Sequence, residues 1–392
     1  MVDVALGVAH APAGVKPGFG MRVEAGPVAH RRHAAFCRQA LCGPAQHPAW
    51  VAGWAAHVNG DIIFLSLSNG DREIMRLPLE VVDEGLGRVA TPVGGRHANG
   101  CFPALVRDAE FPAPEDLTRM LAGALSQARP DIALAALPRL QPDMAGRANP
   151  LVLPASGASP NVALAVDLSG GFDETLQRHS GKRKRKKHRT NERKFREQGD
   201  IAVQTATDRE TARRLLDTFF ELKAQRFAAL GIDDVFADAD VRAFFHRLYA
   251  EEAAQDETAF VLHALEVGGT IRAITGSSLC GKRMICEFSA FRPDRAENTS
   301  PGDYLFFECI RWACERGFLI YDFSVGDEPY KRLWCDIETV QRDTLIALNA
   351  RGRIMAAMRN GTTSLKRQIK NTPPLWAAYK SLRKLRAATN ES

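Results

Sequence analysis

Groups that can move a proton gather between residues 318 and 334. Tyr330 can act as an acid, because a phenol with a pKa of about 10 titrates close enough to a thiol to protonate a departing thiolate. Lys331 beside it can hold negative charge. Asp322 ends an apolar stretch and is a candidate base, since a carboxylate in such a run is costly to bury unless it is paired or functional. The segment therefore predicts an acid–base site at the end of a strand.

Glu287, inside a second apolar stretch, is another candidate base. Each of these candidates also has a structural interpretation. Strand alternation can place Glu287 on the solvent face. Asp322 can orient Lys331 or Arg332, and the turn-forming residues around Tyr330 are common in surface loops.

Residues 300–317 have the pattern of a helix that starts in a way suited to binding an anion. Ser300 followed by Asp303 is a capping-box pattern, and Pro301 occupies a favoured first helical position. Apolar residues recur at helical spacing until Gly317, which predicts the end of the helix. The free N–H groups and the dipole of such a start favour anions. The alternative is a well-capped helix, because Asp303 would oppose a nearby phosphate.

Three predicted strands precede this helix and one follows it. Residues 259–267, 271–279 and 284–291 are apolar stretches joined by short turns that contain glycine, which predicts an antiparallel meander. Residues 318–321 follow the helix as a buried strand. The helix must therefore cross over from the meander to a fourth strand.

This order of elements, together with several spaced motifs, resembles the GNAT acyltransferase core. The similarity is strongest to the GNAT-type domain of the CelD-like bacterial proteins associated with cellulose and exopolysaccharide synthesis, a group related to Fem-type peptidyltransferases. It spans roughly residues 165–345. The usual GNAT phosphate loop is absent. The motifs are Ser300-Pro301-Gly302, Asp322, Gly326-Asp327-Glu328-Pro329-Tyr330-Lys331 and Trp334, preceded by Leu222 with Arg226 and by Val235-Phe236-Ala237-Asp238.

The resemblance implies an α/β fold of tandem GNAT-like domains, each a mixed, mostly antiparallel sheet flanked by helices. It implies an acyl-CoA-dependent N- or O-acyltransferase, most simply an acetyltransferase, that uses acetyl-CoA or another acyl-CoA as co-substrate and no metal. The acceptor would be a small molecule or a glycan precursor of the cell envelope. Ser300, Gly302 and Asp303 would hold the CoA pyrophosphate, and Arg226 and Trp334 would bind substrate.

Two other functions fit the same residues. A Fem-like transferase would take an aminoacyl group from tRNA, which the basic segments of the chain would suit. A non-catalytic GNAT-fold module would bind an anionic partner, and the missing glycine-rich loop favours it. Binding of CoA compared with binding of aminoacyl-tRNA separates these possibilities.

Length and composition predict two domains and a sizeable core, since the chain has 392 residues and is 45% hydrophobic. We expect a loose N-terminal segment over residues 1–45, a degenerate GNAT-like domain over 46–140 and a proline-rich linker over 141–160. A GNAT-type acyltransferase domain follows over 161–346, and a basic helical tail over 347–392. The degenerate domain is expected to contain helices at 50–58 and 114–128, and strands at 62–67, 73–79 and 132–137.

The net charge of +6 is unevenly distributed. Residues 182–196 contain ten Lys or Arg against one Glu, and residues 361–386 contain seven with no acid, so the rest of the chain is acidic. The first segment can form a cationic helix that contacts an anionic membrane surface or tRNA, or it can be a solvated helix face. No apolar run approaches the length that spans a bilayer. We expect a cytoplasmic protein, with peripheral attachment to the inner membrane face as an option.

Eight cysteines form no Cys-x-x-Cys pair and are expected to be reduced, mostly buried thiols. A cluster of metal-binding residue types lies near the N-terminus, but its spacings do not fit a zinc site, so no metal is expected there. The cluster comprises His30, His33, Cys37, Cys42 and His47.

Overall fold

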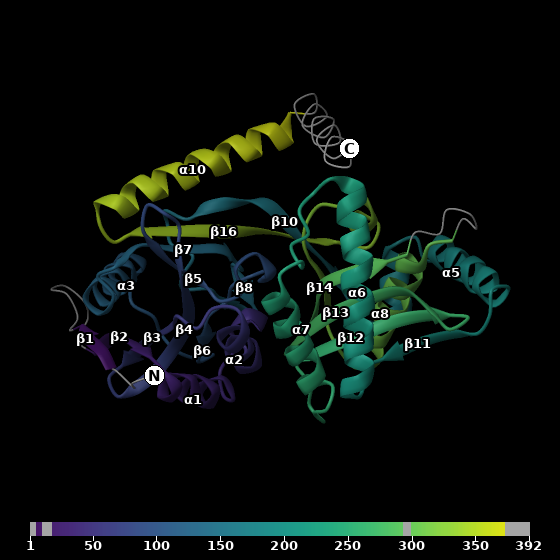
Figure 1. Cartoon of the computed structure of the whole chain (residues 1–392), viewed down its shortest axis with the longest axis horizontal. Coiled ribbons are helices and arrows are strands. Elements are labelled where there is room, and N and C mark those ends of the chain that lie inside the picture. Colours follow the sequence, from purple (N-terminus) through teal and green to yellow (C-terminus); the bar gives the residue numbers. More distant parts are fainter. Residues whose placement is uncertain (1–4, 10–17, 293–298, 373–392) are drawn as a thin grey trace. The chain divides into compact units, whose positions relative to one another are not determined.

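The computed structural model describes residues 5–9, 18–292 and 299–372. The chain divides into two compact units. The N-terminal unit comprises residues up to Val162 together with Thr339–Ile369, and the C-terminal unit comprises Ala163–Glu338 with the residues from Lys370 onward. Figure 1 labels the elements of both units.

The sheet of the N-terminal unit is mixed. Strands β1 to β5 pair antiparallel in chain order, β7 pairs parallel with β5, and β16 pairs antiparallel with β7. The short strand β6 pairs with β4. The strands are β1 (Ala5–Ala9), β2 (Phe19–Ala25), β3 (Ile62–Asn69), β4 (Arg72–Asp83), β5 (Arg88–Pro92), β6 (Ala104–Leu105), β7 (Ile132–Leu140) and β16 (Ile337–Ala347).

Four α-helices belong to this unit in the described part of the chain: α1 (Pro27–Cys37), α2 (Pro48–His57), α3 (Pro114–Ala128) and α10 (Ala350–Asn371), with short 3₁₀ turns at Pro44–Gln46 and Gly95–His97. Helix α10 approaches β7 closely at Gly352, where an added Cβ would lie 1.8 Å from the Ala133 carbonyl oxygen. Met355, one turn along the same face, packs into the core formed by Val89 and Leu134. The expected helices at 50–58 and 114–128 and the three expected strands are confirmed.

Three segments differ from expectation. Residues 18–45 are not loose, because β2 pairs with β3 along its whole length and α1 follows it. The predicted linker carries the hairpin β8 (Asp143–Met144) and β9 (Arg147–Ala148), and then the start of β10 (Gly157–Asp167). Its Asn149 side chain is buried and donates to the Cys101 and Gln141 carbonyls, so this segment packs as structure. The predicted tail over 347–392 starts at the last residue of β16 and continues into α10, which belongs to the N-terminal unit up to Ile369, whereas the predicted helix at 376–385 lies outside the described residues.

The C-terminal unit has the strand order β10-β15-β14-β13-β12-β11. Neighbours pair antiparallel except β14 and β15, which are parallel. Its strands are β11 (Ile201–Thr205), β12 (Phe260–Val267), β13 (Thr270–Cys280), β14 (Arg283–Phe291) and β15 (Ile320–Val325). Helix α8 (Pro301–Glu315) connects β14 to β15, so the predicted meander, crossover helix and parallel fourth strand are confirmed.

Helices cover both faces of this sheet. On one face α8 packs over β12 to β14, and α4 (Gly171–Arg178) and α5 (Gly181–Arg196) pack against α8. On the other face α6 (Arg209–Leu230) and α7 (Ala239–Glu252) pack side by side, as Figure 1 also shows. Gly231 ends α6 in the left-handed conformation at φ 58°, as its position after the apolar repeat predicts. The short helix α9 (Pro329–Arg332) follows β15.

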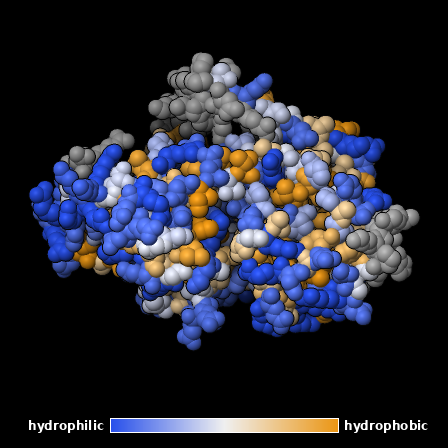
Figure 2. Space-filling model, turned by 180° about the vertical axis from the view of Figure 1, so that it is seen from behind, coloured by the Kyte–Doolittle hydropathy of each residue, from blue (hydrophilic) through white to orange (hydrophobic). Residues whose placement is uncertain are grey.

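All eight cysteines are thiols and none forms a disulfide: three are buried and five half-buried. No helix among the described residues is long and apolar enough to cross a membrane. The molecular face in Figure 2 is mostly hydrophilic, and its hydrophobic residues occur in small groups.

Candidate active site

Strands β14 and β15 part beyond their first three residue pairs. Arg283 to Ile285 of β14 are in register with Ile320 to Asp322 of β15, after which β14 continues to Phe291 and β15 to Val325 without further pairs between them. Strands that diverge leave backbone N–H and C=O groups outside the ladder, and these groups need other partners. This β14–β15 divergence is the centre of the candidate site.

A β-bulge lies in β14 at the start of the divergence. Gly276 faces Phe288 and Ser277 faces Cys286, so Glu287 is the extra residue. In a regular strand Cys286 and Phe288 would point to the same face of the sheet. The bulge places them on opposite faces: Cys286 packs in the core under α8, whereas Phe288 packs against Phe219 of α6. Bulges occur often beside active sites, where the extra residue leaves the ladder and its backbone can bind a ligand.

The side chain of Glu287 is half-buried and accepts a hydrogen bond of 2.6 Å from the Ser278 hydroxyl. The bulge places the backbone of Glu287 two residues beyond the last pair of β14 with β15, while its carboxylate bonds to the meander strand β13. The expected position inside a regular apolar strand is therefore refined: Glu287 interrupts the strand.

Asp322 ends the paired part of β15 and is 6% exposed. Its carboxylate accepts from Arg283 at 2.7 Å and from the backbone N–H of Ser324 at 2.7 Å. Ser324 has φ 62°, a left-handed conformation that a serine adopts at a cost, and the Asp322 carboxylate holds it there. The partner of Asp322 is thus Arg283, and not Lys331 or Arg332. This geometry supports a positioning role that shapes the end of β15.

Tyr330 and Lys331 lie on α9, directly after β15. The Tyr330 ring is stacked on Phe306 of α8, with centroids 5.4 Å apart and 6° between the planes. Burial raises the pKa of the Tyr330 phenol, and the neighbouring Cys286 and Glu328 raise it further. Tyr330 therefore stays protonated near neutral pH and can act only as a donor.

Lys331 is 4% exposed, which is rare for a lysine. Its ammonium donates to the Val325 carbonyl at 2.9 Å and pairs with Glu328 at 2.9 Å. The side chain ties α9 to the last residue of β15. It thereby fixes Tyr330 next to the divergence.

Two cations reach the divergence from α6. The Arg226 guanidinium lies 5.0 Å from the centroid of the Phe291 ring at the end of β14. Lys223, one turn earlier, lies over the rings of Phe219 and Phe227. Burial and, to a smaller extent, repulsion from Arg226 together lower the pKa of Lys223 to about 8. Sequence reasoning missed Lys223, although its i, i+3 spacing to Arg226 placed both on one helix face.

The start of α8 lies against the same strand end. Ser300 occupies the N-cap, but its side chain makes no capping bond, so the predicted capping box is wrong. Its backbone N–H donates instead to the Asn191 side chain of α5 at 3.3 Å. Asp303 forms an ion pair with Lys187, which neutralises the carboxylate that would oppose an anion. At Gly302 an added Cβ would lie 3.1 Å from the Phe291 ring, so glycine allows this close approach.

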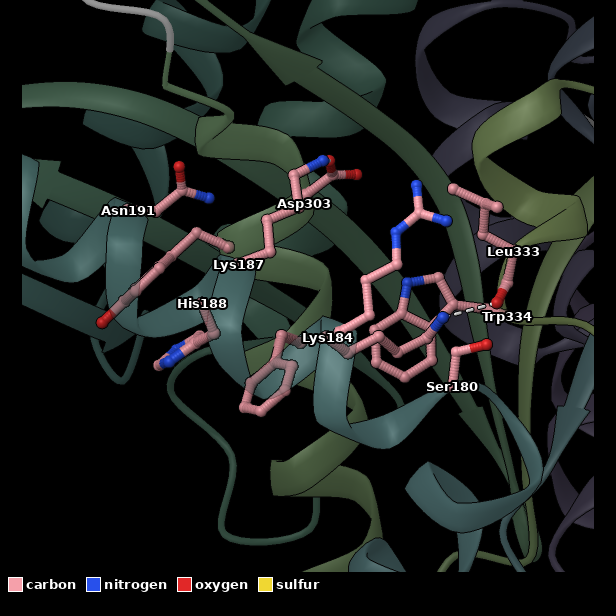
Figure 3. Close-up of a pocket in the computed structure, with 11 residues that line it drawn as sticks. Ser180, Lys184, Lys187, His188, Asn191, Asp303, Leu333 and Trp334 are labelled. Carbon is pink, nitrogen blue, oxygen red and sulfur yellow. Dashed lines mark hydrogen bonds and ion pairs between the residues drawn. The ribbon is translucent and has the colours of Figure 1, made fainter.

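A pocket lies beside the start of α8, between α5, α8 and the end of α9 (Figure 3). Lys184 crosses it, 4.4 Å over the centroid of the Trp334 ring, and donates to the Leu333 carbonyl at 2.6 Å. Burial and, to a smaller extent, repulsion from Arg183 and Lys187 together lower the pKa of Lys184 to about 8. Crowded cations beside an aromatic wall suit a phosphorylated ligand. The lining also includes Ser180, His188, Asn191, Asp303, Tyr304 and Phe307.

His188 docks the basic helix onto α8. Its ring is stacked between Tyr304 at 4.3 Å and Phe307 at 4.2 Å, and its Nε2 lies 2.6 Å from Glu308 Oε1. The predicted cationic helix over 182–196 is confirmed, but only part of it faces solvent. Its regular run of lysines and arginines gave no signal that this histidine would anchor it.

The predicted site residues fall into two neighbouring groups. Around the divergence lie Glu287, Asp322, Tyr330, Lys331 and Arg226, whereas Asp303 and Trp334 line the pocket. Ser300 and Gly302 lie between them, and Gly302 contacts Phe291, which also contacts Arg226. Among the described residues, no group of three or more His, Cys, Asp or Glu side chains is arranged to hold a metal ion.

Comparison with known proteins gives a match to a domain model and a similar fold. Residues 182–332 match the family model of the acetyltransferase (GNAT) domain. The crystal structure of FemX is similar, with a TM-score of 0.55 and 13% identity, over 82% of this chain and 96% of that one. A tandem GNAT protein from the clavulanic acid biosynthesis pathway is also similar, with a TM-score of 0.44 and 11% identity, over 84% of this chain and 99% of that one. The C-terminal domain of a putative lysylphosphatidylglycerol synthetase from Agrobacterium fabrum has a TM-score of 0.46 and 13% identity, over 84% of this chain and 95% of that one. No curated protein sequence matches.

FemX shares low identity with the chain and indicates the fold alone. The family match covers α5 to α9, the elements that build the divergence and the pocket. Residues 182–332 of the C-terminal unit are therefore similar to a GNAT acetyltransferase domain, and the likeness to FemX shows the fold alone.

Proposed function

We propose that the C-terminal unit transfers an acyl group, most simply acetyl, from acyl-CoA to an amine or hydroxyl. The observation that carries the proposal is the bulge at Glu287 beside the β14–β15 divergence, with the start of α8 on the Phe291 end of the same strand. Backbone N–H groups outside the ladder can polarise a thioester carbonyl, and a helix start beside them can hold phosphate.

The residues at the start of α8 and in the pocket fit acyl-CoA as the acyl donor. The amides opening α8 and the cations of the pocket would hold its phosphates, since Lys187 has already neutralised Asp303. Tyr330, kept protonated by burial, would give its proton to the departing thiolate.

Two groups can take the proton of the acceptor. Burial lowers the pKa of Lys223 to about 8, so about a tenth of it is neutral at pH 7, and Glu287 lies on the bulge itself. Asp322 and Lys331 are committed to Arg283, Ser324, Val325 and Glu328, and we assign them positioning roles. Arg226, exposed above Phe291, is placed to contact an anionic part of either substrate.

The acceptor we propose is a sugar amine or hydroxyl of an envelope glycan precursor. The sequence resemblance to the CelD-like group supports this proposal. Screening acetyl transfer to amino sugars against amino acids of similar size tests it, and equal turnover with both classes would remove the sugar preference.

A Fem-like, aminoacyl-tRNA-dependent transferase is the second candidate. It is favoured by the exposed cations Lys182, Lys186 and Arg189, which follow one face of α5 at i, i+4 and i+7 spacing. Equilibrium binding of acetyl-CoA and of aminoacyl-tRNA to the full chain separates the two. Micromolar CoA binding with acetyl transfer supports the first function, and tRNA binding with aminoacyl transfer the second. Binding of polyanions with neither transfer would leave a non-catalytic module.

We also propose peripheral attachment to an anionic membrane surface through α10. Ile354, Met358 and Leu365 lie in line on this helix and are 58%, 57% and 57% exposed. The helix contains no acidic residue, and a cationic helix with an exposed apolar stripe is typical of interfacial binding. A variant that carries Ile354→Ser, Met358→Ser and Leu365→Ser should no longer sediment together with phosphatidylglycerol vesicles. Equal sedimentation of variant and wild type would refute this attachment.

A further inference from the structure

Two thiols of the N-terminal unit lie together, away from the proposed transferase site. Cys37 is the last residue of α1, and Cys42 lies in the turn that follows it. Their sulfur atoms are 3.8 Å apart. Both side chains are half-buried, so a small solute can reach them.

A buried histidine adjoins this pair. His33 lies one turn before Cys37 on α1 and is 1% exposed. Its Nε2 atom is 3.4 Å from the Cys37 sulfur and 2.7 Å from the Gln46 carbonyl oxygen. The helix repeat thus holds an imidazole against one thiol, while the turn holds the second thiol against the same sulfur.

This environment favours the thiolate of Cys37. The contact with Cys42 and the imidazole of His33 lower the pKa of Cys37 to about 6, although burial opposes the shift. The other core thiols behave in the opposite way, because burial raises the pKa of Cys101, Cys286 and Cys309 to about 12. Thiolate character and access, not burial, decide which cysteines react with oxidants.

We propose that Cys37 and Cys42 form a peroxide-reactive thiol pair that closes into a disulfide. The Cys37 thiolate attacks one oxygen of a hydroperoxide, the O–O bond breaks, and Cys37 becomes a sulfenic acid while water or an alcohol leaves. The Cys42 sulfur then attacks the Cys37 sulfur, the S–O bond breaks, and a second water leaves. Two thiols are oxidised by two electrons in total, and the peroxide is reduced.

The chain between the two cysteines can accommodate the shorter distance. Residues 38–40 belong to no helix or strand, and Leu41 is held through an isolated bridge to Leu105. A turn of this kind adjusts more easily than a helix or a ladder. Closure would draw Cys42 toward the end of α1 and leave the strands of the sheet unchanged.

Intact-protein mass spectrometry tests the pair directly. The full chain is treated with stoichiometric hydrogen peroxide, quenched, and alkylated under denaturing conditions with N-ethylmaleimide. We expect six labelled cysteines in place of eight, a mass loss of about 2 Da before labelling, and a cross-linked peptide joining Cys37 to Cys42. Labelling of all eight after peroxide treatment would overturn the proposal.

Three variants assign the roles. Cys42→Ser should stop at the sulfenic acid, which dimedone traps on Cys37, whereas Cys37→Ser should not react on the same timescale. Cys314→Ser is the matched control, because Cys314 is also half-buried but burial raises its pKa to about 11. It should form the disulfide as the wild type does. A disulfide that persists in Cys37→Ser would assign the reaction to other cysteines and refute the pair.

Discussion

The two units of the chain repeat one topology and differ at the place where that topology can bind a ligand. In each, an antiparallel meander leads into a helix that crosses to a parallel strand: β5, α3 and β7 in the N-terminal unit, and β14, α8 and β15 in the C-terminal unit. In both units the parallel pair holds together over only a few residues and then ends.

Beyond that point the N-terminal unit is closed. Cys101 bridges to Leu140 of β7, with its N–H donating to the Arg139 carbonyl and its own carbonyl accepting from Gln141, each at 2.9 Å. The side chains of Gln46 and Asn149 bond to the same segment. The edge of β7 beyond its pairs with β5 is therefore bonded to another segment of the unit. In the C-terminal unit β14, the counterpart of β5, carries the bulge at Glu287 just beyond its last pair with β15.

The two crossover helices also differ in the charge at their starts. Helix α3 begins with Glu115 and Asp116, and Asp116 pairs with Arg119 of its own helix. Helix α8 begins with Gly302 and with Asp303, which Lys187 neutralises. In the function proposed above, the charge brought by α5, and not topology alone, would make the start of α8 a phosphate site.

The strongest way to test this comparison is Tyr330→Phe. If the C-terminal unit alone is catalytic, the variant should lower kcat by on the order of 10²-fold, because only proton donation is removed. Affinity for acetyl-CoA, measured by calorimetry, should stay unchanged, and this serves as the internal control. Wild-type turnover in the variant would remove Tyr330 from the mechanism.

Gly302→Val and Gly123→Val compare the two crossover helices directly. In α8 the new side chain would press on Phe291, and we expect CoA affinity to fall by about tenfold or more. In α3 an added Cβ at Gly123 meets nothing within 4 Å, so this matched control should bind CoA normally. If both variants bind CoA like the wild type, the phosphates rest elsewhere.

Removing positive charges from α5 tests whether this helix binds a polyanion more strongly than ordinary surface charge does. Replacing the exposed Lys182, Lys186 and Arg189 with Gln should weaken binding to RNA or anionic vesicles several-fold. The salt dependence should also become flatter, by about 0.7–0.9 in slope for each phosphate that the variant no longer neutralises. The control removes equal charge from the N-terminal unit through Arg22, Arg31 and Arg38, all exposed. Equal weakening in both variants would show a nonspecific charge effect.

The smallest expected effect concerns stability and pH. The pKa of Lys223 is lowered from 10.5 to about 8, so between these values the unfolded chain binds a proton that the folded chain does not. Stability should therefore rise with pH across this window through Lys223, which Arg226, Cys286, Asp234 and Glu328 surround. Thermal unfolding of Lys223→Met, followed across the same window, should show a smaller rise than the wild type. An identical slope in both proteins would contradict the lowered pKa.

Periodicity made much of the fold predictable, since α3 begins and ends where its apolar repeat does and β12 to β14 follow their turns. Strand β2 was missed because its order depends on pairing with β3, from which α1 and α2 separate it in sequence. In the site, Tyr330 and Gly302 were identifiable by type and motif. The bulge at Glu287 was not, because a bulge is defined by the register of two strands. Arg283, which pairs with Asp322, was missed for the same reason.

The last strand and helix of the N-terminal unit come from the far end of the chain. Strand β16 covers β7 through Thr344 to Ala347, and Met355 of α10 completes the core at Val89. During synthesis the ribosome therefore releases Ala163–Glu338 of the C-terminal unit before the N-terminal unit can acquire these elements. Residues 163–338 can thus fold first, although most of the N-terminal unit, Met1–Val162, was made before them. A shortened protein that ends at residue 160 would lack β16 and α10 and leave the edge of β7 exposed to aggregation.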